Sequence, residues 1–291
     1  MSKPVIAILG SGNIGVDLAE RILHTSEFEI AGLIGRRADS PGLKRMEAKG
    51  VPVFSGGLED FLDQKLIVDG FFDATSAFDH VRHWHRIQNE TESWAVDLTP
   101  SRIGQEVIPI LDKELIQRGD QRNFNMVTCG GQSSSPVLAA MAAAAEGVSN
   151  VEISSSIASD SAGPATRRNL DHYIEATEAT AARIAKANSK AILVLNPALP
   201  QVMMRTSVTL EASNMDLEMA EKNVKEMIGR VSEDVPGYKL VLPPTEIAPN
   251  VFLSTVSVEG AGHYLPKYSG NLDIINAAAI QTARIVSGLS K

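Results

Sequence analysis

Cysteine is almost absent from this chain. Cys129 is the single cysteine among 291 residues, which excludes an intrachain disulfide and a zinc site built from several cysteines. Long hydrophobic runs are absent too: no stretch approaches the roughly 20 apolar residues of a membrane-spanning helix. Val5 to Leu9 is too short for the apolar core of a signal peptide. We therefore expect a soluble, cytoplasmic protein with no membrane partner and one thiol that needs an explanation.

Basic residues are in the minority. The chain has 27 Lys and Arg against 35 Asp and Glu, a formal net charge of −8. This charge repels phosphate backbones and no basic run compensates for it, so nucleic acid is not expected as a partner. With 44% hydrophobic residues, the composition is that of a globular protein. Because domains usually contain about 100–150 residues, we expect two of them.

Apolar runs and helical spacing alternate along the first half of the chain. Strands are expected at residues 5–9, 30–34, 68–73 and 94–98, with a helix after each of the first three. This βαβ alternation predicts an α/β fold that opens with a Rossmann domain, a doubly wound parallel sheet covered by helices.

The second half is richer in strands. Strands are expected at residues 151–159, 191–195, 202–210 and 251–258, with helices at 136–146, 170–184 and 217–231. This pattern predicts a second, α+β domain with a largely antiparallel sheet. A last helix, from Ser269, is expected to return to the first domain. We therefore predict a first domain of residues 1–129 and 270–291 and a second domain of residues 130–269.

A glycine-rich turn joins the first predicted strand to the first predicted helix. Residues 10–15 match the G-x-G-x-x-G pattern. In this context the turn brings backbone N–H groups at the start of a helix to a pyrophosphate. The pattern indicates a dinucleotide site for NAD or NADP, and a purely structural tight turn is the alternative. The predicted cofactor contacts are Gly10, Ser11, Gly12, Asn13, Ile14 and Gly15.

The end of the second predicted strand bears on the choice of cofactor. An acidic residue there binds the ribose 2′-hydroxyl of NAD, but this chain has Gly35-Arg36-Arg37. Because an arginine pairs well with a 2′-phosphate, we hypothesise that Arg36 lets NADP bind. Two solvated surface arginines are the alternative.

Cys129 stands between a predicted strand and a predicted helix. It precedes Gly130-Gly131, and Pro136 suits the first turn of the alanine-rich helix. Near a helix N-terminus, a thiol pKa falls below its usual value of about 8.5, and free N–H groups can receive an oxyanion. We interpret Cys129 as a nucleophile. The alternative is a small buried hydrophobic residue, which gains nothing from two flexible glycines.

Several short motifs beyond the glycine-rich turn are typical of one family. The most specific are residues 125–132, Asn-Met-Val-Thr-Cys-Gly-Gly-Gln, and residues 270–273, Gly-Asn-Leu-Asp. On these motifs the chain resembles, over essentially its whole length, the acylating acetaldehyde dehydrogenases of aromatic meta-cleavage pathways, relatives of the semialdehyde dehydrogenases. The other matching segments are residues 73–77, 97–100, 161–164, 166–167, 196–198 and 258–273.

The resemblance implies an activity, a set of partners and further cofactor contacts. A short-chain aldehyde would be attacked by Cys129, oxidised by NAD or NADP, and released as an acyl-CoA when coenzyme A takes the acyl group. The second domain would be the catalytic and dimerisation domain of a homodimer. A TIM-barrel 4-hydroxy-2-oxoacid aldolase would supply the aldehyde, within aromatic hydrocarbon catabolism. The implied cofactor contacts in the second half are Ser161, Ala162, Gly163, Pro164, Ala165, Thr166, Arg167, Arg168, Asn169 and Asn271.

The chain departs from the family pattern at three places. Met204-Arg205 is followed by Thr206, where the pattern has an aspartate proposed to orient the catalytic groups. Residues 133–135 are Ser-Ser-Ser in place of Ala-Thr-Ile, and Arg36-Arg37 replaces Ile-Asp. The general base is therefore not identified. Substrate and cofactor preferences are both open to change.

The histidines offer one candidate base and no metal site. His263 can act as an acid or base because imidazole titrates near neutrality, and a structural role is the alternative. His80, His83 and His85 have a poor helical spacing for a shared metal. We assign no metal.

Two other functions remain open. A phosphorylating semialdehyde dehydrogenase would use phosphate where coenzyme A acts. A non-catalytic, nucleotide-sensing protein would keep the fold without the chemistry, as the threonine at position 206 suggests.

Overall fold

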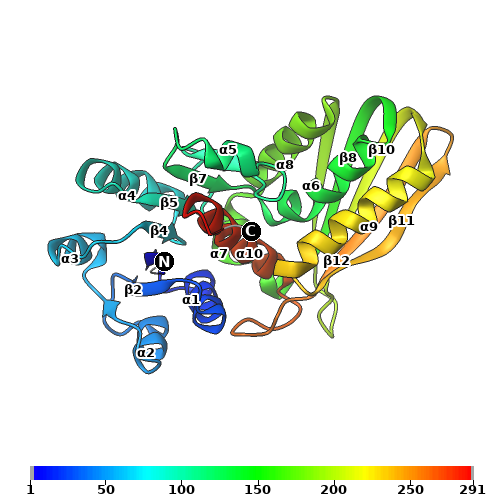
Figure 1. The fold of residues 1–291 in the computed structure, drawn as a ribbon. Helices are drawn as coiled ribbons and strands as arrows, with labels where there is room; N and C mark the ends of the chain where they lie inside the picture. The colour runs from blue at the N-terminus through cyan, green and yellow to red at the C-terminus, as the bar shows by residue number, and fades with distance from the viewer. Residues whose placement is uncertain (1–2, 290–291) are drawn as a thin grey trace. The chain divides into compact units, whose positions relative to one another are not determined.

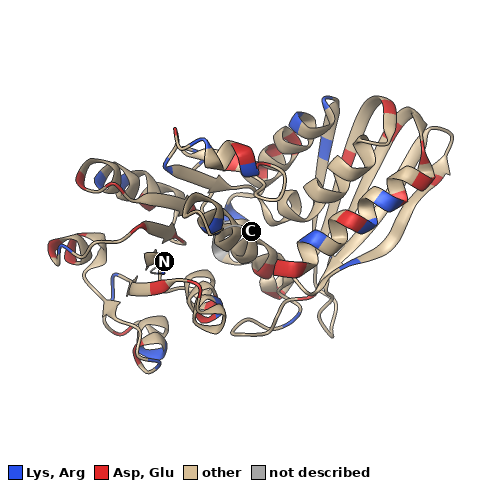
Figure 2. Cartoon of the chain, in the orientation of Figure 1, with Lys and Arg blue, Asp and Glu red and all other residues tan. Residues whose placement is uncertain are grey.

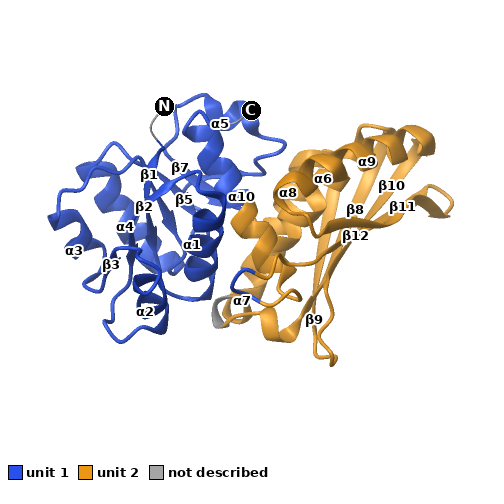
Figure 3. Cartoon of the chain, turned by 60° about the horizontal axis from the view of Figure 1, so that its bottom comes forward, with its two compact units in different colours: residues 1–126, 263–265, 278–291 blue, residues 127–262, 266–277 orange. Residues whose placement is uncertain are grey.

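The computed structural model describes residues 3–289, apart from the side chains of residues 164 and 165. It divides into two compact units (Figure 3). Unit 1 comprises residues 1–126, 263–265 and 278–291, and unit 2 comprises residues 127–262 and 266–277. Cys129 thus belongs to unit 2, and the last helix, α10 (Gly270–Val286), contributes residues to both units.

Unit 1 is built on a seven-stranded sheet with the order β3-β2-β1-β4-β5-β7-β6 (Figure 1). Neighbouring strands run parallel, and the central strands β1, β4, β5 and β7 are almost entirely buried, as expected of a sheet covered on both faces. The predicted Rossmann-like domain is confirmed. The strands are β1 (Val5–Leu9), β2 (Glu29–Ile34), β3 (Val53–Phe54), β4 (Gly70–Asp73), β5 (Trp94–Asp97), β6 (Gln105–Val107) and β7 (Asn123–Met126), and the helices are α1 (Asn13–Thr25), α2 (Pro41–Glu47), α3 (Gly57–Asp63), α4 (Ala77–Glu90) and α5 (Lys113–Gln117).

Unit 2 is built on a five-stranded mixed sheet with the order β11-β12-β10-β8-β9. Only the pair β8–β9 is parallel in this sheet, because helix α8 carries the chain back across it between the two strands. The expected second domain with a largely antiparallel sheet is confirmed. Its strands are β8 (Ala145–Ala158), β9 (Asn188–Asn196), β10 (Met204–Met215), β11 (Tyr238–Ala248) and β12 (Val251–Val258), and its helices are α6 (Cys129–Ala142), a 3-10 turn at Ser159–Ser161, α7 (Pro164–Arg168), α8 (Leu170–Ala185) and α9 (Leu217–Asp234).

One face of the unit 2 sheet is covered by helices α6, α8 and α9 (Figure 3). Strand residues alternate between this covered face and an open face. Ser155 and Thr206 are cross-strand neighbours whose side chains are buried on the covered face. The covered face therefore holds hydroxyl groups directly beneath the helices.

Several elements of unit 2 differ from the sequence-based expectation. Strand β8 already begins at Ala145, inside the helix expected at residues 136–146, and the short helix α7 was not expected. Helix α6 begins at Cys129, well before Pro136, because the Thr128 side chain caps it by accepting the N–H of Gly131 at 2.9 Å. Pro136 therefore lies inside the helix and not in its first turn. Strand β11 was not expected from the sequence, because it contains Pro243 and Pro244; its pairing with β12 shifts register near them.

The surface carries both signs of charge. The positions of acidic and basic residues alternate along the helices (Figure 2). On α9, for example, Lys225 pairs with Glu221. Within residues 3–289, no helix combines the length and the apolar character needed to cross a membrane.

Candidate functional site

The glycine-rich turn follows the carboxyl end of β1 and leads into α1. Gly10 has a φ of +110°, and a Cβ atom there would lie 2.7 Å from the carbonyl oxygen of Ala74. A Cβ on Gly15 would lie 1.9 Å from the Gly10 carbonyl oxygen. Both positions therefore require glycine: one for its backbone conformation, and both for close packing.

The start of α1 fits a phosphate group. Its N-cap, Gly12, provides no side chain to cap the helix, and its first turn contains no acidic residue. A Cβ on Gly12 would meet no atom within 4 Å, so the space beside the helix start is open. Backbone N–H groups and the helix dipole favour an anion at such a place. These residues fit the pyrophosphate of a dinucleotide.

The loop between β4 and α4 is packed against this turn through Ala74. Asp73 holds the loop in place, because its Oδ1 accepts the backbone N–H of Thr75 at 3.0 Å and also the hydroxyl of Thr75. Ser76 then caps α4 by accepting the N–H of Asp79 at 3.1 Å. The side chain of Asp73 thus shapes one wall of the predicted dinucleotide site.

A buried histidine joins the ends of two neighbouring strands beneath that loop. His80 Nδ1 lies 3.0 Å from Asp73 Oδ2, and His80 Nε2 lies 3.6 Å from Asp97 Oδ2. Burial disfavours the charged ring, but the hydrogen bond to Asp73 and the charge of Asp97 prevail and raise the pKa of His80. Burial raises the pKa of Asp97 to about 6. This network was not identified from the sequence, since its members become neighbours only through the pairing of β4 with β5.

Arg36 lies at the end of β2, where the sequence places it. Its guanidinium is 74% exposed and lies 3.3 Å from a carboxylate oxygen of Asp79 on α4. It lines a cavity of about 490 Å³ together with Arg82, His83 and Arg86. Arg36, Arg82 and Arg86 provide positive charge and hydrogen-bond donors of the kind that bind a 2′-phosphate. The same cavity is also lined by Glu59 and Asp79.

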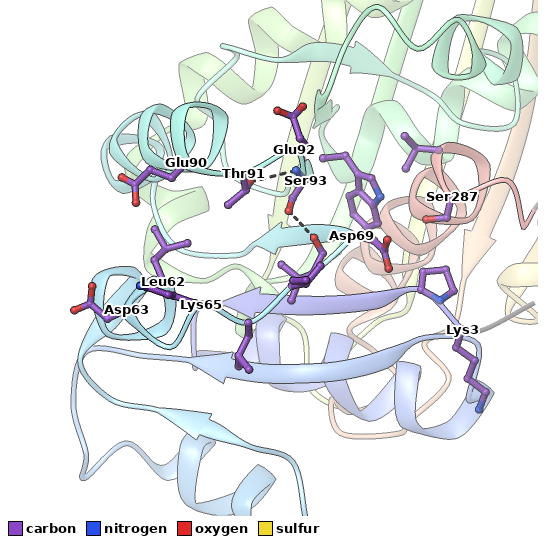
Figure 4. A pocket seen from close by; sticks show the side chains of 16 residues that line it. Lys3, Leu62, Asp63, Lys65, Asp69, Glu90, Thr91, Glu92, Ser93 and Ser287 are labelled. Atoms are coloured by element: carbon purple, nitrogen blue, oxygen red, sulfur yellow. Dashed lines mark hydrogen bonds between the residues drawn. The ribbon is translucent and has the colours of Figure 1, made fainter.

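A second cavity of unit 1 lies at the opposite ends of the strands. Its volume is about 1030 Å³, and it is lined by residues at the amino ends of β1, β4 and β5, including Lys3, Asp69 and Ser93 (Figure 4). The Ser93 hydroxyl donates to the Val68 carbonyl at 2.6 Å. Because ligands of such sheets bind at the carboxyl ends of the strands, we do not assign the dinucleotide to this cavity.

Cys129 is the first residue of α6, as expected for a thiol at a helix N-terminus. The expected low pKa is wrong, however. The residue is only 9% exposed, and burial raises the pKa of its thiol to about 11, although the Tyr173 hydroxyl and the N–H groups of Gly130 and Cys129 favour the thiolate. The cost of burying a thiolate exceeds the stabilisation that the N–H groups at the helix start give to it. The thiol is therefore protonated at neutral pH.

Tyr173 on α8 is the polar neighbour of this thiol. Its hydroxyl oxygen lies 3.8 Å from Cys129 Sγ. A Cβ on Gly130 would lie 2.1 Å from the Tyr173 hydroxyl and 2.9 Å from Ser155 Oγ. Because Gly130 has no side chain, the Tyr173 hydroxyl can lie close to the backbone beside the thiol. The sequence did not reveal Tyr173. The periodicity of this helix predicts a buried face with Leu170, Ile174, Thr177, Ala181 and Ile184; Thr177 and Ala181 are buried, but Leu170 is exposed and Tyr173 is buried in addition.

A chain of buried hydroxyls continues from Tyr173. Ser155 hydrogen-bonds the phenol and lies 3.2 Å from Thr206 Oγ1. Thr206 Oγ1 lies 2.7 Å from Ser133 Oγ, which donates to the Gly130 carbonyl oxygen at 3.1 Å. Thr206 and Ser133, two of the departures from the family pattern, are thus neighbours in the structure.

The other predicted cofactor contacts lie in unit 2. Ser161 and Ala162 are buried, Gly163 and Arg168 are exposed, and Thr166 and Asn169 are half-buried. Arg167 donates to the carbonyl oxygens of Ala162 and Ser159 at 3.0 and 2.7 Å, so it stabilises its own turn. The side chains of Pro164 and Ala165 lie outside the described residues.

Asn271 is buried near the start of α10. Its Nδ2 donates to the Ser161 carbonyl oxygen at 3.4 Å, whereas its Oδ1 accepts no hydrogen bond from any described residue. A buried acceptor without a donor fits a ligand that brings an N–H group, such as a carboxamide. This observation supports Asn271 as a cofactor contact.

His263 belongs to unit 1 and is exposed. Its ring lies 4.8 Å from the ring of His24, centroid to centroid. Its place among the catalytic groups stays a prediction.

The chain is similar to known proteins over its full length. The family model described as "Prokaryotic acetaldehyde dehydrogenase, dimerisation" matches residues 129–266. An acetaldehyde dehydrogenase of Pectobacterium atrosepticum is 42% identical over 288 residues, covering 99% of this chain and 97% of that protein. One from Spirochaeta aurantia is 44% identical over 285 residues, covering 97% of this chain and 94% of that protein.

The fold has solved counterparts. Aspartate semialdehyde dehydrogenase from Candida albicans, solved with NADP, has a TM-score of 0.66 at 13% identity and covers 98% of this chain and 99% of its own. The structure of aspartate semialdehyde dehydrogenase II from Vibrio cholerae has a TM-score of 0.65 at 14% identity, with 99% of both chains covered. At this identity the likeness shows the fold alone. The full-length identity to the curated relatives shows more: the chain belongs to the acetaldehyde dehydrogenase family, a family of oxidoreductases.

Proposed function

We propose that this protein is an acylating aldehyde dehydrogenase, which converts a short-chain aldehyde, NAD or NADP, and coenzyme A to an acyl-CoA and the reduced cofactor. The observation that carries the proposal is the setting of Cys129. The thiol lies at the first turn of a helix, beside two backbone N–H groups and one phenol. This arrangement suits covalent catalysis by a thiol.

Unit 1 would bind the dinucleotide and unit 2 would carry the chemistry. The glycine-rich turn would hold the pyrophosphate, and Arg36 would lie at the ribose end of the dinucleotide. When bound, the nicotinamide supplies a hydride acceptor. We place catalysis and dimerisation in the domain of residues 130–269 and cofactor binding in residues 1–129 and 270–291. The nucleophile Cys129 lies at this boundary, as the first residue of α6 in unit 2.

Cys129 would act twice as the covalent carrier. Its sulfur adds to the aldehyde carbon, so that a C–S bond forms and the carbonyl oxygen becomes a hydroxyl. After oxidation the same sulfur holds the acyl group as a thioester. The thiol of coenzyme A then attacks the thioester carbon, and the Cys129 sulfur leaves with a proton.

The test is the formation of reduced cofactor at 340 nm from acetaldehyde or propanal, with and without coenzyme A. We expect turnover that needs coenzyme A and that Cys129→Ala abolishes. Phosphate-dependent turnover without coenzyme A would instead identify a phosphorylating semialdehyde dehydrogenase. The absence of any Cys129 adduct with aldehyde and cofactor, measured by mass spectrometry, would favour the non-catalytic alternative.

The open face of the unit 2 sheet supports the proposed homodimer. Ile192 and Val194 on β9 are 40% and 45% exposed, and Ser154 and Ser207 continue the row from Ile192 across β8 and β10. This row is uncharged, and the neighbouring row from Val194 leads through Ser156 to Arg205. A partly apolar sheet face of this kind is suited to contact with a second copy. Val194→Glu should shift the mass measured by light scattering from dimer to monomer, and Ile67→Glu, at a 93% exposed site on unit 1, is the matched control.

The aldolase partner implied by the resemblance is also a proposal. Copurification with an aldolase from the source organism would test it. Comparing the native protein with the Val194→Glu variant would show whether aldolase binding needs the dimer.

A further inference from the structure

We propose that Tyr173 is a catalytic residue that passes a proton between the Cys129 thiol and the carbonyl oxygen of the aldehyde. The inference rests on the proposed function, because it concerns the addition of the aldehyde to the same sulfur. Its first support is contact: the phenol oxygen lies 3.8 Å from Cys129 Sγ, a hydrogen-bonding distance for the larger sulfur atom.

The hydrogen bonds among the neighbouring hydroxyls determine which way the Tyr173 O–H points. A hydroxyl has a single O–H to donate. Ser133 uses its O–H on the Gly130 carbonyl, so Ser133 Oγ accepts from Thr206. Thr206 Oγ1 in turn accepts from Ser155.

Ser155 then has only acceptor capacity left for the phenol, with which it interacts. The Tyr173 O–H therefore points to Ser155, and its oxygen lone pairs face the thiol. In the ligand-free protein the phenol is thus arranged to accept a proton from sulfur. The Gly130 backbone N–H also interacts with the phenol oxygen.

The proton transfer avoids the formation of a buried charge on Cys129 or Tyr173. Burial raises the pKa of the Cys129 thiol to about 11 and that of the Tyr173 phenol well above its usual value. A free thiolate and a free phenolate are both costly here. If the phenol accepts one proton while it donates another, neither a free thiolate nor a free phenolate is formed.

The step balances without a further reactant. The S–H proton moves to the phenol oxygen, the sulfur electron pair forms the C–S bond, and the carbonyl π pair moves to oxygen. That oxygen takes the original phenol proton, as the O–H turns from Ser155 to the aldehyde. The product is a neutral hemithioacetal on Cys129, and Tyr173 ends as it began.

The measurement is the exchange of [1-13C]acetaldehyde between solution and Cys129, followed by 13C saturation transfer. This exchange needs neither a dinucleotide nor coenzyme A. We expect Tyr173→Phe to slow it by about 10²–10⁴-fold, the usual contribution of general acid–base catalysis, and to lower kcat/KM for turnover in parallel. An exchange rate equal to that of the native protein would overturn the proposal.

A matched control separates this role from a structural one. Tyr238 is also buried, and its hydroxyl donates to the Ser133 carbonyl at 2.6 Å without touching the thiol. Tyr238→Phe should keep a native exchange rate. An equal slowing in both variants would overturn the proposal in favour of a packing effect.

Fluorotyrosines at position 173 cover the case in which Tyr173→Phe does not fold. They keep the hydroxyl and lower its pKa in steps, so the exchange rate should vary with phenol acidity. A rate that does not depend on it would overturn the proposal. If the native protein exchanges the aldehyde but shows no coenzyme A-dependent turnover, the proposed function is wrong and the role of Tyr173 is not contradicted.

Discussion

His80 and Asp73 form a buried ion pair, with Nδ1 and Oδ2 3.0 Å apart and neither side chain more than 1% exposed. The ring also faces Asp97, Asn123 and, across Asp73, His83. Since Asp73 also holds the N–H of Thr75, this pair links the core of unit 1 to the loop beside the glycine-rich turn. Charge on His80 therefore bears on both stability and cofactor binding.

Stability should fall as the pH rises above neutrality. The pKa of His80 is raised in the folded protein, so its contribution is complete below the unfolded-state pKa of about 6.5 and is lost as the pH passes the higher folded-state pKa. His80→Gln should lower the free energy of unfolding in urea by about 1.5–3 kcal/mol near neutral pH, the usual value of a hydrogen bond to a charged group, because Asp73 loses one buried partner and keeps His83 and Thr75.

The difference between native and His80→Gln should shrink in alkaline buffer. His85→Gln on the exposed side of α4 is the control and should match the native protein. Equal pH dependence of the native and His80→Gln proteins would show that the ring is not charged when folded.

The reactivity of Cys129 should keep rising with pH. Because burial raises the pKa of the thiol to about 11, the thiolate fraction grows about tenfold per pH unit through the range in which an ordinary thiol, with a pKa of about 8.5, levels off. Alkylation by iodoacetamide, followed by mass spectrometry, measures this directly. A plateau near the ordinary thiol pKa would mean that the helix N-terminus outweighs burial. Cys129→Ser should remain unlabelled.

Gly130→Ala should destabilise the protein. The new Cβ would lie 2.1 Å from the Tyr173 hydroxyl, and overpacking of this kind costs about 1–3 kcal/mol. Gly229→Ala in the exposed part of α9 meets no atom within 4 Å and should stabilise by about 0.5–1 kcal/mol. Urea unfolding of both variants gives the comparison.

The double variant Gly130→Ala with Tyr173→Phe locates the clash. Removing the hydroxyl should restore part of the lost stability, so the two changes should not be additive. Additive losses would place the strain elsewhere than at the phenol.

Arg36→Ala should change the choice of cofactor. Loss of a charge-assisted contact to a 2′-phosphate costs about 1.5–3 kcal/mol, so kcat/KM for NADP should fall at least about tenfold. The kcat/KM for NAD should remain unchanged. Arg37→Ala is the matched control, because that side chain is 73% exposed and pairs with Asp39 at 3.1 Å. A similar loss for both cofactors would rule out recognition of the 2′-phosphate by Arg36.

Much of the architecture could be predicted from local patterns. The buried run from Val5 to Leu9, the following glycines and the periodic residues of α1 mark a strand, a turn and a helix within a few residues of one another. The conformation of Gly10 and the helix start at Cys129 follow from the same local logic. The misplaced start of α6 has a local cause as well: Thr128 caps the helix, and this signal is weaker in the sequence than Pro136.

The sequence alone determined the two-domain α/β organisation, the family and the candidate nucleophile, because periodicity, turn chemistry and short motifs depend on neighbouring residues. Only the tertiary structure decided what surrounds that nucleophile. Tyr173 is 44 positions from Cys129 along the chain, and Thr206 is farther still; they meet because α6 and α8 pack on the same face of one sheet. The raised thiol pKa has the same origin, since burial is a property of the packed fold and not of the local sequence.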